Sequence, residues 1–203
     1  MSTPPKDFRY FRLNKVYRFG RSIAQTAMRF SVSGYDLESM VDRNSDQKPF
    51  IIDTGSQRET FERIRDILNI NLQKRQRIAI AAPERRLLEG LHYYLGPTRT
   101  FFSTKNTSLR TYNFDDERRA LLITTHSLKG LEFETLIVFG FNQSLTAVQR
   151  MRAEQRLMQN VFVALTRANE NLYLIREPDC IPELRDIEGY TLSTEASPDE
   201  FDF

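Results

Sequence analysis

Residues 77–83 read Arg77-Ile78-Ala79-Ile80-Ala81-Ala82-Pro83. The run from Ile78 to Ala82 is apolar without alternation, which is typical of a strand that is covered on both faces. Pro83 favours the start of a helix, and Gly96-Pro97 favours its end. The stretch therefore predicts a buried strand followed by an amphipathic helix, whose apolar side carries Leu87, Leu88, Leu91 and Tyr94.

The same alternation of strand and helix continues on both sides of this unit. Strands are predicted at 49–54, 121–125, 136–140 and 172–175, and helices at 22–30, 57–73 and about 147–168. Residues 97–120 are less regular and predict a short strand and loop. Strict alternation predicts an α/β fold, with a mostly parallel sheet and helices on both of its faces.

Composition restricts the class of protein. The 203 residues are 40% hydrophobic and include 15 Phe, which is enough for one substantial core. One Cys and two His exclude an intrachain disulfide and argue against a zinc module. No apolar run approaches the ~18 residues of a membrane span, and the first ten residues lack the pattern of a signal peptide. We therefore expect a soluble, cytoplasmic protein with no membrane partner.

The first stretch with chemical potential is Thr124-Thr125-His126-Ser127-Leu128-Lys129-Gly130-Leu131-Glu132-Phe133. It brings hydroxyls, an imidazole, an ammonium group and a carboxylate into one turn between two predicted strands. Ends of strands in open parallel sheets are common ligand sites. The alternative is a capped turn in which Thr and Ser satisfy backbone N–H groups and Lys129 is solvated.

The second stretch is Asn160-Val161-Phe162-Val163-Ala164-Leu165-Thr166-Arg167-Ala168-Asn169. It places Arg167 near the end of a strongly apolar helix, just before the last predicted strand. Arg167 either pairs with the final carbonyl groups of its helix or serves as a cation for the charge that develops on a phosphate. The sequence has no Gly-x-x-x-x-Gly-Lys-Ser/Thr loop, so a nucleotide would have to be bound mainly by another domain or chain.

Taken together, the two stretches closely resemble motifs V and VI of the UvrD/Rep/PcrA-like superfamily 1 DNA helicases. The resembling segments are 124–133 for motif V and 161–168 for motif VI, and residues 13–23 resemble motif IV. The resemblance implies a RecA-like motor domain, the second of two, over residues 1–180, followed by a loosely attached tail over 181–203. It also implies an ATP-dependent DNA helicase, with DNA repair as the setting.

The resemblance also implies roles for residues of the ATP site. Arg18 and Arg167 match the arginines that approach the γ-phosphate, and Tyr17 matches the aromatic residue that stacks on adenine. Glu132 matches a carboxylate on the ribose side of the nucleotide. The turn beside it is shaped by Lys129 and Gly130. Mg²⁺ would be held by the first motor domain, which this chain lacks, so no metal ligand and no ATPase activity are expected of the chain alone.

Single-stranded DNA is the second partner that the resemblance implies. Thr125 and His126 match residues whose hydroxyl and imidazole groups hydrogen-bond phosphate without reading sequence. The alternative function is a non-catalytic adaptor that binds nucleic acid and keeps only the RecA-like shape. Two arginines aimed at a phosphate favour the motor, since an adaptor does not need them.

Overall fold

A parallel sheet forms the centre of the computed structural model, which describes residues 15–31, 36–43, 47–103, 109–113 and 118–191. Within these residues the strand order is β3-β4-β2-β5-β6-β1-β7, and all neighbouring strands are parallel. The strands are β1 (Phe50–Asp53), β2 (Ile78–Ala82), β3 (Thr100–Phe102), β4 (Ala120–Thr124), β5 (Phe133–Val138), β6 (Ala168–Arg176) and β7 (Tyr190–Thr191). The predicted α/β fold is confirmed.

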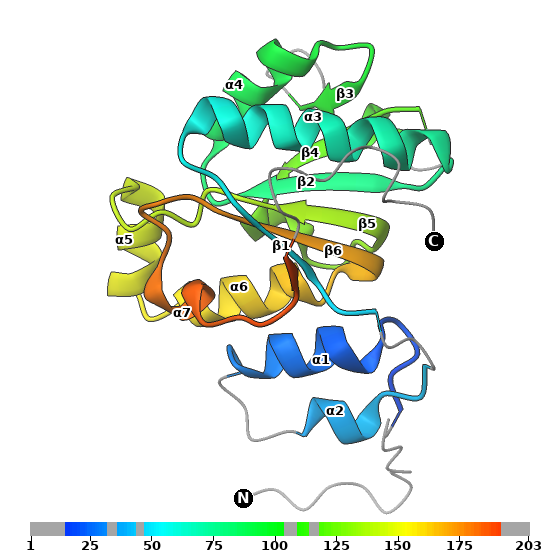
Figure 1. Cartoon of the computed structure of the whole chain (residues 1–203), viewed down its shortest axis with the longest axis vertical. Helices are drawn as coiled ribbons and strands as arrows, with labels where there is room; N and C mark the ends of the chain where they lie inside the picture. The colour runs from blue at the N-terminus through cyan, green and yellow to red at the C-terminus, as the bar shows by residue number, and fades with distance from the viewer. Residues whose placement is uncertain (1–14, 32–35, 44–46, 104–108, 114–117, 192–203) are drawn as a thin grey trace, which may run out of the picture.

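Two helices cover one face of the sheet, α3 (Gln57–Gln73) and α4 (Arg85–Leu95), as Figure 1 shows. The helix α3 begins at Ser56, whose Oγ accepts from the Glu59 backbone N–H at 3.2 Å, while Oε2 of Glu59 accepts from Gly55 N–H at 2.7 Å. This reciprocal capping fixes the helix start at Ser56, three residues after the end of β1. The core on this face is built from Ile64, Leu68, Leu88, Leu91, Ile78, Ile80, Leu122 and Ile137, among others.

The opposite face carries α1 (Arg21–Met28), α5 (Thr146–Ala153), α6 (Leu157–Leu165) and α7 (Pro182–Arg185), and α2 (Leu37–Met40) lies beyond α1 (Figure 1). Helix α6 is the centre of this layer, because Val161, Ala164 and Leu165 are fully buried. The odd and even residues of β2 divide between the two cores, with Ala79 and Ala81 on this side. A strand buried on both faces explains the continuous apolar run in the sequence.

The prediction of one long helix over 147–168 is wrong, because the chain forms two helices, α5 and α6, with a break between them. Gln155 adopts a left-handed backbone at the break, with φ of 55°. Val148 and Leu157 are nine residues apart, so one continuous helix would place them on opposite sides. Both are buried in the same core, and the break is what allows that.

Other elements differ from the predictions at their ends. The strand β6 begins four residues before the predicted start, and β5 begins three residues before. Residues 97–120 contain β3 and a short 3-10 helix, η1 (Leu109–Thr111), with 104–108 and 114–117 outside the described residues. In the segment expected to form a tail, residues 181–191 include α7 and β7, and Ile181, Leu184 and Ile187 are buried. Residues 192–203 lie outside the described part.

None of the helices described is long and apolar enough to cross a membrane.

Two glycines provide a test of this packing. Gly140 follows β5 with φ of 75°, and a Cβ added there would lie 2.5 Å from Cδ1 of Leu87. We expect Gly140→Ala to lower the free energy of unfolding by about 1–2 kcal/mol from backbone strain, with a further cost for displacing Leu87. Gly90→Ala is the matched control, because its Cβ would sit 3.7 Å from Phe61 inside α4 and should stabilise by about 0.5–1 kcal/mol. Urea denaturation of both variants measures the difference, and equal midpoints would contradict it.

Candidate nucleotide and nucleic-acid site

Pairing between β5 and β6 brings the two candidate stretches together at the amino edge of the sheet. Glu132 directly precedes β5, and Arg167 directly precedes β6. Phe133 lies opposite Ala168 in the sheet, and the Phe133 N–H donates to the carbonyl of Arg167 at 3.0 Å. Side chains that are 35 positions apart in the sequence are therefore neighbours in the fold.

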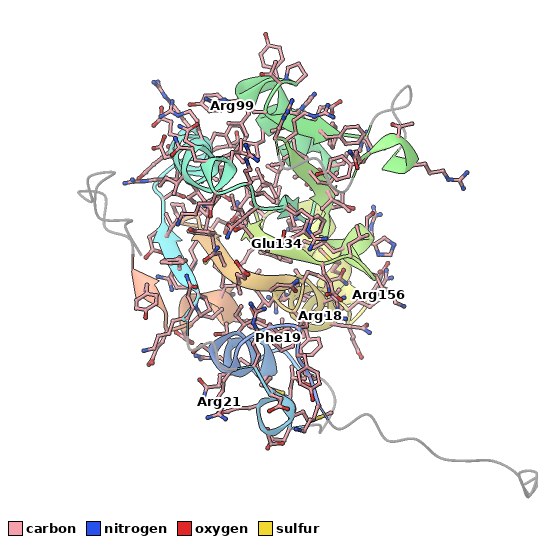
Figure 2. All side chains as sticks on the ribbon, turned by 90° about the vertical axis from the view of Figure 1, so that its right-hand side faces the viewer. Arg18, Phe19, Arg21, Arg99, Glu134 and Arg156 are labelled. Atoms are coloured by element: carbon pink, nitrogen blue, oxygen red, sulfur yellow. The ribbon has the colours of Figure 1, made fainter. Side chains whose placement is uncertain are left out.

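Arg18 reaches the same place from a third segment, the loop before α1. Its Nε lies 2.6 Å from Oε1 of Glu132, with the two side chains 36% and 38% exposed. In Figure 2, Arg18 and Phe19 lie on the side of α1 that faces the rest of the fold. Phe19 is buried, so it anchors the loop beside Arg18 in the core.

Arg167 makes the helix-end contacts that the sequence analysis gave as one of two alternatives. Its Nε donates to the carbonyl of Val163 at 3.1 Å, and its Nη2 donates to Oγ1 of Thr166 at 3.3 Å, so it does cap its own helix. Its pKa also depends on burial and on the neighbouring charges. Burial lowers the pKa of Arg167 from its usual value, the positive charge of Arg18 lowers it further, and Glu132 opposes both. The cluster of Arg18, Arg167 and Glu132 contains two guanidinium groups and one carboxylate, which leaves a surplus positive charge.

The other residues predicted for the nucleotide surround this cluster. Tyr17 is next to Arg18 and is 65% exposed, so most of its side chain is accessible to a ligand. Lys129 and Gly130 are exposed in the turn that leads to Glu132. Gly130 has φ of 86° and open space around its Cα, so glycine fits that turn for its backbone conformation.

Thr125 and His126 lie at the opposite, carboxyl edge of the sheet. They follow β4 within a short 3-10 helix, η2 (Thr125–Leu128), and the chain then returns to the amino edge to begin β5. His126 is exposed, whereas Thr125 is 1% exposed and its Oγ1 has no hydrogen-bond partner in the described part of the chain. The structure thus divides the predicted residues into two groups at opposite edges of one sheet.

The structure agrees only in part with the interpretation of residues 124–133 as a capped turn. The hydroxyl groups of Thr124 and Ser127 bond to each other at 3.0 Å, and no side chain caps the start of η2. Leu128 is fully buried and anchors the turn in the core. The hydroxyl of Thr125 therefore has no hydrogen-bond partner among the described residues of this turn.

Sequence reasoning gave no role to Arg43, which lies beside the arginine cluster. Its Nη1 donates to the carbonyl of Arg18 at 3.0 Å and to the carbonyl of Asn169 at 2.7 Å. These partners are 25 and 126 positions away, so no local pattern in the sequence could have indicated them.

The described residues contain no group of three or more His, Cys, Asp or Glu side chains able to hold a metal ion.

Known proteins resemble the chain in sequence and in fold. A family model described as the UvrD-like helicase C-terminal domain matches residues 100–177. A probable DNA helicase II homolog of Mycoplasma pneumoniae is 43% identical over 63 residues, which cover 27% of this chain and 8% of the relative. The crystal structure of the C-terminal domain of a possible DNA helicase from Lactobacillus plantarum has a TM-score of 0.63 at 21% identity and covers 86% of this chain and 98% of that one. The expected RecA-like fold is therefore confirmed.

A pair of buried threonines tests whether the Thr125 hydroxyl is unpaired. Thr125→Val keeps the shape and removes a hydroxyl without a partner, so the free energy of unfolding should stay constant or rise by up to about 1 kcal/mol. Thr135→Val is the matched control, because Thr135 is equally buried and its Oγ1 bonds Gln76 at 2.6 Å. That variant should lose about 1–3 kcal/mol in thermal or urea unfolding. A comparable loss in both variants would show that Thr125 has a structural partner.

Proposed function

We propose that the chain is the second RecA-like motor domain of an ATP-dependent superfamily 1 DNA helicase, because the UvrD-like helicase C-terminal domain model matches residues 100–177. In this proposal it completes an ATP site and a single-stranded DNA track together with a first RecA-like domain. The first domain supplies the phosphate loop, which this sequence does not contain. It also supplies the Mg²⁺ ligands, because the described residues of this chain contain no group of side chains able to hold a metal ion.

The observation that carries the proposal is the meeting of Arg18 and Arg167 at one edge of the sheet, around Glu132. Phosphoryl transfer depends on fixed cations that meet the charge developing on the transferred group. Arg167 is partly buried and held by the end of its helix, so little reorganisation is needed when a phosphate arrives. Arg18 is paired with a carboxylate that a phosphate can replace.

The remaining residues at the amino edge suit the rest of ATP. Tyr17 offers an exposed ring for the adenine base, and Glu132 can accept a hydrogen bond from a ribose hydroxyl. Lys129 and Gly130 set the path of the chain into Glu132. When ATP occupies this edge, Glu132 exchanges its contact with Arg18 for one with the ribose, and Arg18 turns to the phosphate.

The carboxyl edge suits DNA. The exposed imidazole of His126 can donate to a phosphate oxygen, and the buried hydroxyl of Thr125 can do so once the turn opens. Neither contact distinguishes one base from another. Residues 125–132 run from the carboxyl edge, where DNA would bind, to the amino edge, where ATP would bind. A conformational change at one site therefore has a short covalent path to the other. An adaptor would have no need for a surplus of positive charge at the amino edge, and this favours the motor over the adaptor.

Arg167 provides the direct test of the motor. In a protein that contains both motor domains, Arg167→Ala should lower DNA-stimulated ATP turnover by about 10²–10³-fold or more, with ATP binding retained. The cost in stability should be about 1 kcal/mol, from the lost bond to Val163. Phosphate release and thermal midpoint are measured on the same sample.

The control is Arg152→Ala, which removes a partly exposed arginine that bonds Glu183 at 2.8 Å, away from the cluster. It should leave turnover near that of the unaltered protein. Near-normal turnover of Arg167→Ala with a lowered midpoint would mean that Arg167 only caps its helix, and the motor assignment would fail.

DNA binding provides a second test. Affinity of the chain for oligothymidine should fall with salt, with a slope of about −0.7 in log K against log salt for each phosphate contacted. Thr125→Val should weaken binding by about 2- to 10-fold without changing that slope, since a neutral hydroxyl releases no counterion. Fluorescence anisotropy at salt concentrations from roughly 50 to 200 mM measures both the affinity and the slope. Binding that is sequence-specific and independent of salt would contradict the proposal.

A further inference from the structure

The loop that carries Arg18 bonds to residues 40–43 through both backbone and side-chain groups. Val16 and Val41 form an isolated parallel bridge, in which Val16 N–H donates to Met40 O at 2.6 Å and Asp42 N–H donates to Val16 O at 2.9 Å. Two positions further along, Arg43 holds the same loop through its side chain. Residues 40–43 therefore bond to the loop through their backbone and also through the guanidinium group of Arg43.

Arg43 connects that loop to the strand that follows Arg167. Its Nη1 donates to the carbonyls of Arg18 and Asn169 at 3.0 and 2.7 Å, and its Nη2 lies 3.5 Å from Oε1 of Glu170. Asn169 comes two residues after Arg167 and lies in β6. A single side chain thus bonds both of the backbone segments that carry the two arginines.

Arg43 bonds to the backbone carbonyl of Arg18, whereas Glu132 contacts the side chain of Arg18. In the proposed function, a phosphate ligand takes the guanidinium of Arg18 away from Glu132, so that ion pair does not hold the loop during the reaction. The carbonyl of Arg18 is not needed by the phosphate. Its bond to Arg43 can therefore persist while the Arg18 side chain moves.

We propose that Arg43 is a positioning residue that aligns Arg18 with Arg167, so that both guanidinium groups meet the same phosphate. The inference rests on the proposed function of Arg18 and Arg167. Arg43 does not touch the ligand in this arrangement. It acts through the backbone of the Arg18 loop.

Turnover of the protein with both motor domains is the first measurement. Displacing a catalytic group by about 1 Å can cost about 100-fold in rate, so Arg43→Ala should lower kcat by about 10- to 100-fold. The KM for ATP should change by less than about threefold, because the loss falls on the transition state. Arg43→Lys keeps one nitrogen that can donate to both carbonyls and should recover a large part of kcat.

A double variant separates positioning from a general loss of stability. If Arg43 acts through Arg18, Arg18→Ala combined with Arg43→Ala should turn over no more slowly than Arg18→Ala alone. Independent effects would multiply instead. The control Arg152→Ala removes a salt-bridged arginine at another place in the fold and should leave kcat unchanged.

Hydrogen–deuterium exchange of this chain tests the attachment without relying on turnover. Arg43→Ala should speed exchange in a peptide covering residues 15–20, while a peptide from α3 keeps its rate. Unchanged exchange in residues 15–20 would overturn the inference, whatever the turnover shows.

The remaining outcomes distinguish this inference from the proposed function. Faster exchange, low kcat and no further loss in the double variant support Arg43 as a positioning residue. If Arg167→Ala is inactive and Arg43→Ala turns over normally, the proposed function stands and the inference is overturned. If Arg167→Ala itself turns over normally, the proposed function fails and the role of Arg43 in catalysis fails with it.

Discussion

A main-chain hydrogen bond from Phe133 to the carbonyl of Arg167, and the β5–β6 register that it belongs to, determine the geometry of the site. This register places the residue before β5 beside the residue before β6. Shifting the pairing by one position would turn every side chain of a strand to the other face of the sheet. Because both faces are buried, the two cores on either side fix the register of residues 135–138 with β6, and an irregularity between Phe133 and Thr135 then brings Phe133 opposite Ala168.

The segment between β4 and β5 extends this constraint across the sheet. It starts at the carboxyl edge with Thr125, is anchored midway by the buried Leu128, and ends at the amino edge with Glu132. A parallel sheet requires such a return, because each strand must begin at the edge where its predecessor began. The proposed DNA and ATP contacts are thus opposite ends of one connection, which suits a motor that couples binding at two sites.

Strand and helix positions could be predicted from the sequence where the apolar pattern is dense. The strand 78–82 and the helix 57–73 agree closely with the structure, since each buries an apolar face and has clear end signals. The amino end of β6 could not be predicted, because Asn169, Glu170 and Asn171 are polar. Glu170 and Asn171 bond to side chains of Gln76 and Thr135 from other elements, and these long-range bonds let polar residues continue a strand.

The sequence by itself determined the alternating order of strands and helices, the parallel sheet and the two stretches around Thr125 and Arg167, because these depend on local apolar periodicity and short motifs. Tertiary structure decided the rest. It split the predicted helix between α5 and α6, since Val148 and Leu157 reach the same core only from two helix axes. It also brought Arg18 to Glu132 and Arg43 to the carbonyl of Arg18. Such contacts between distant segments depend on how the layers pack, and no periodic pattern in the sequence indicates them.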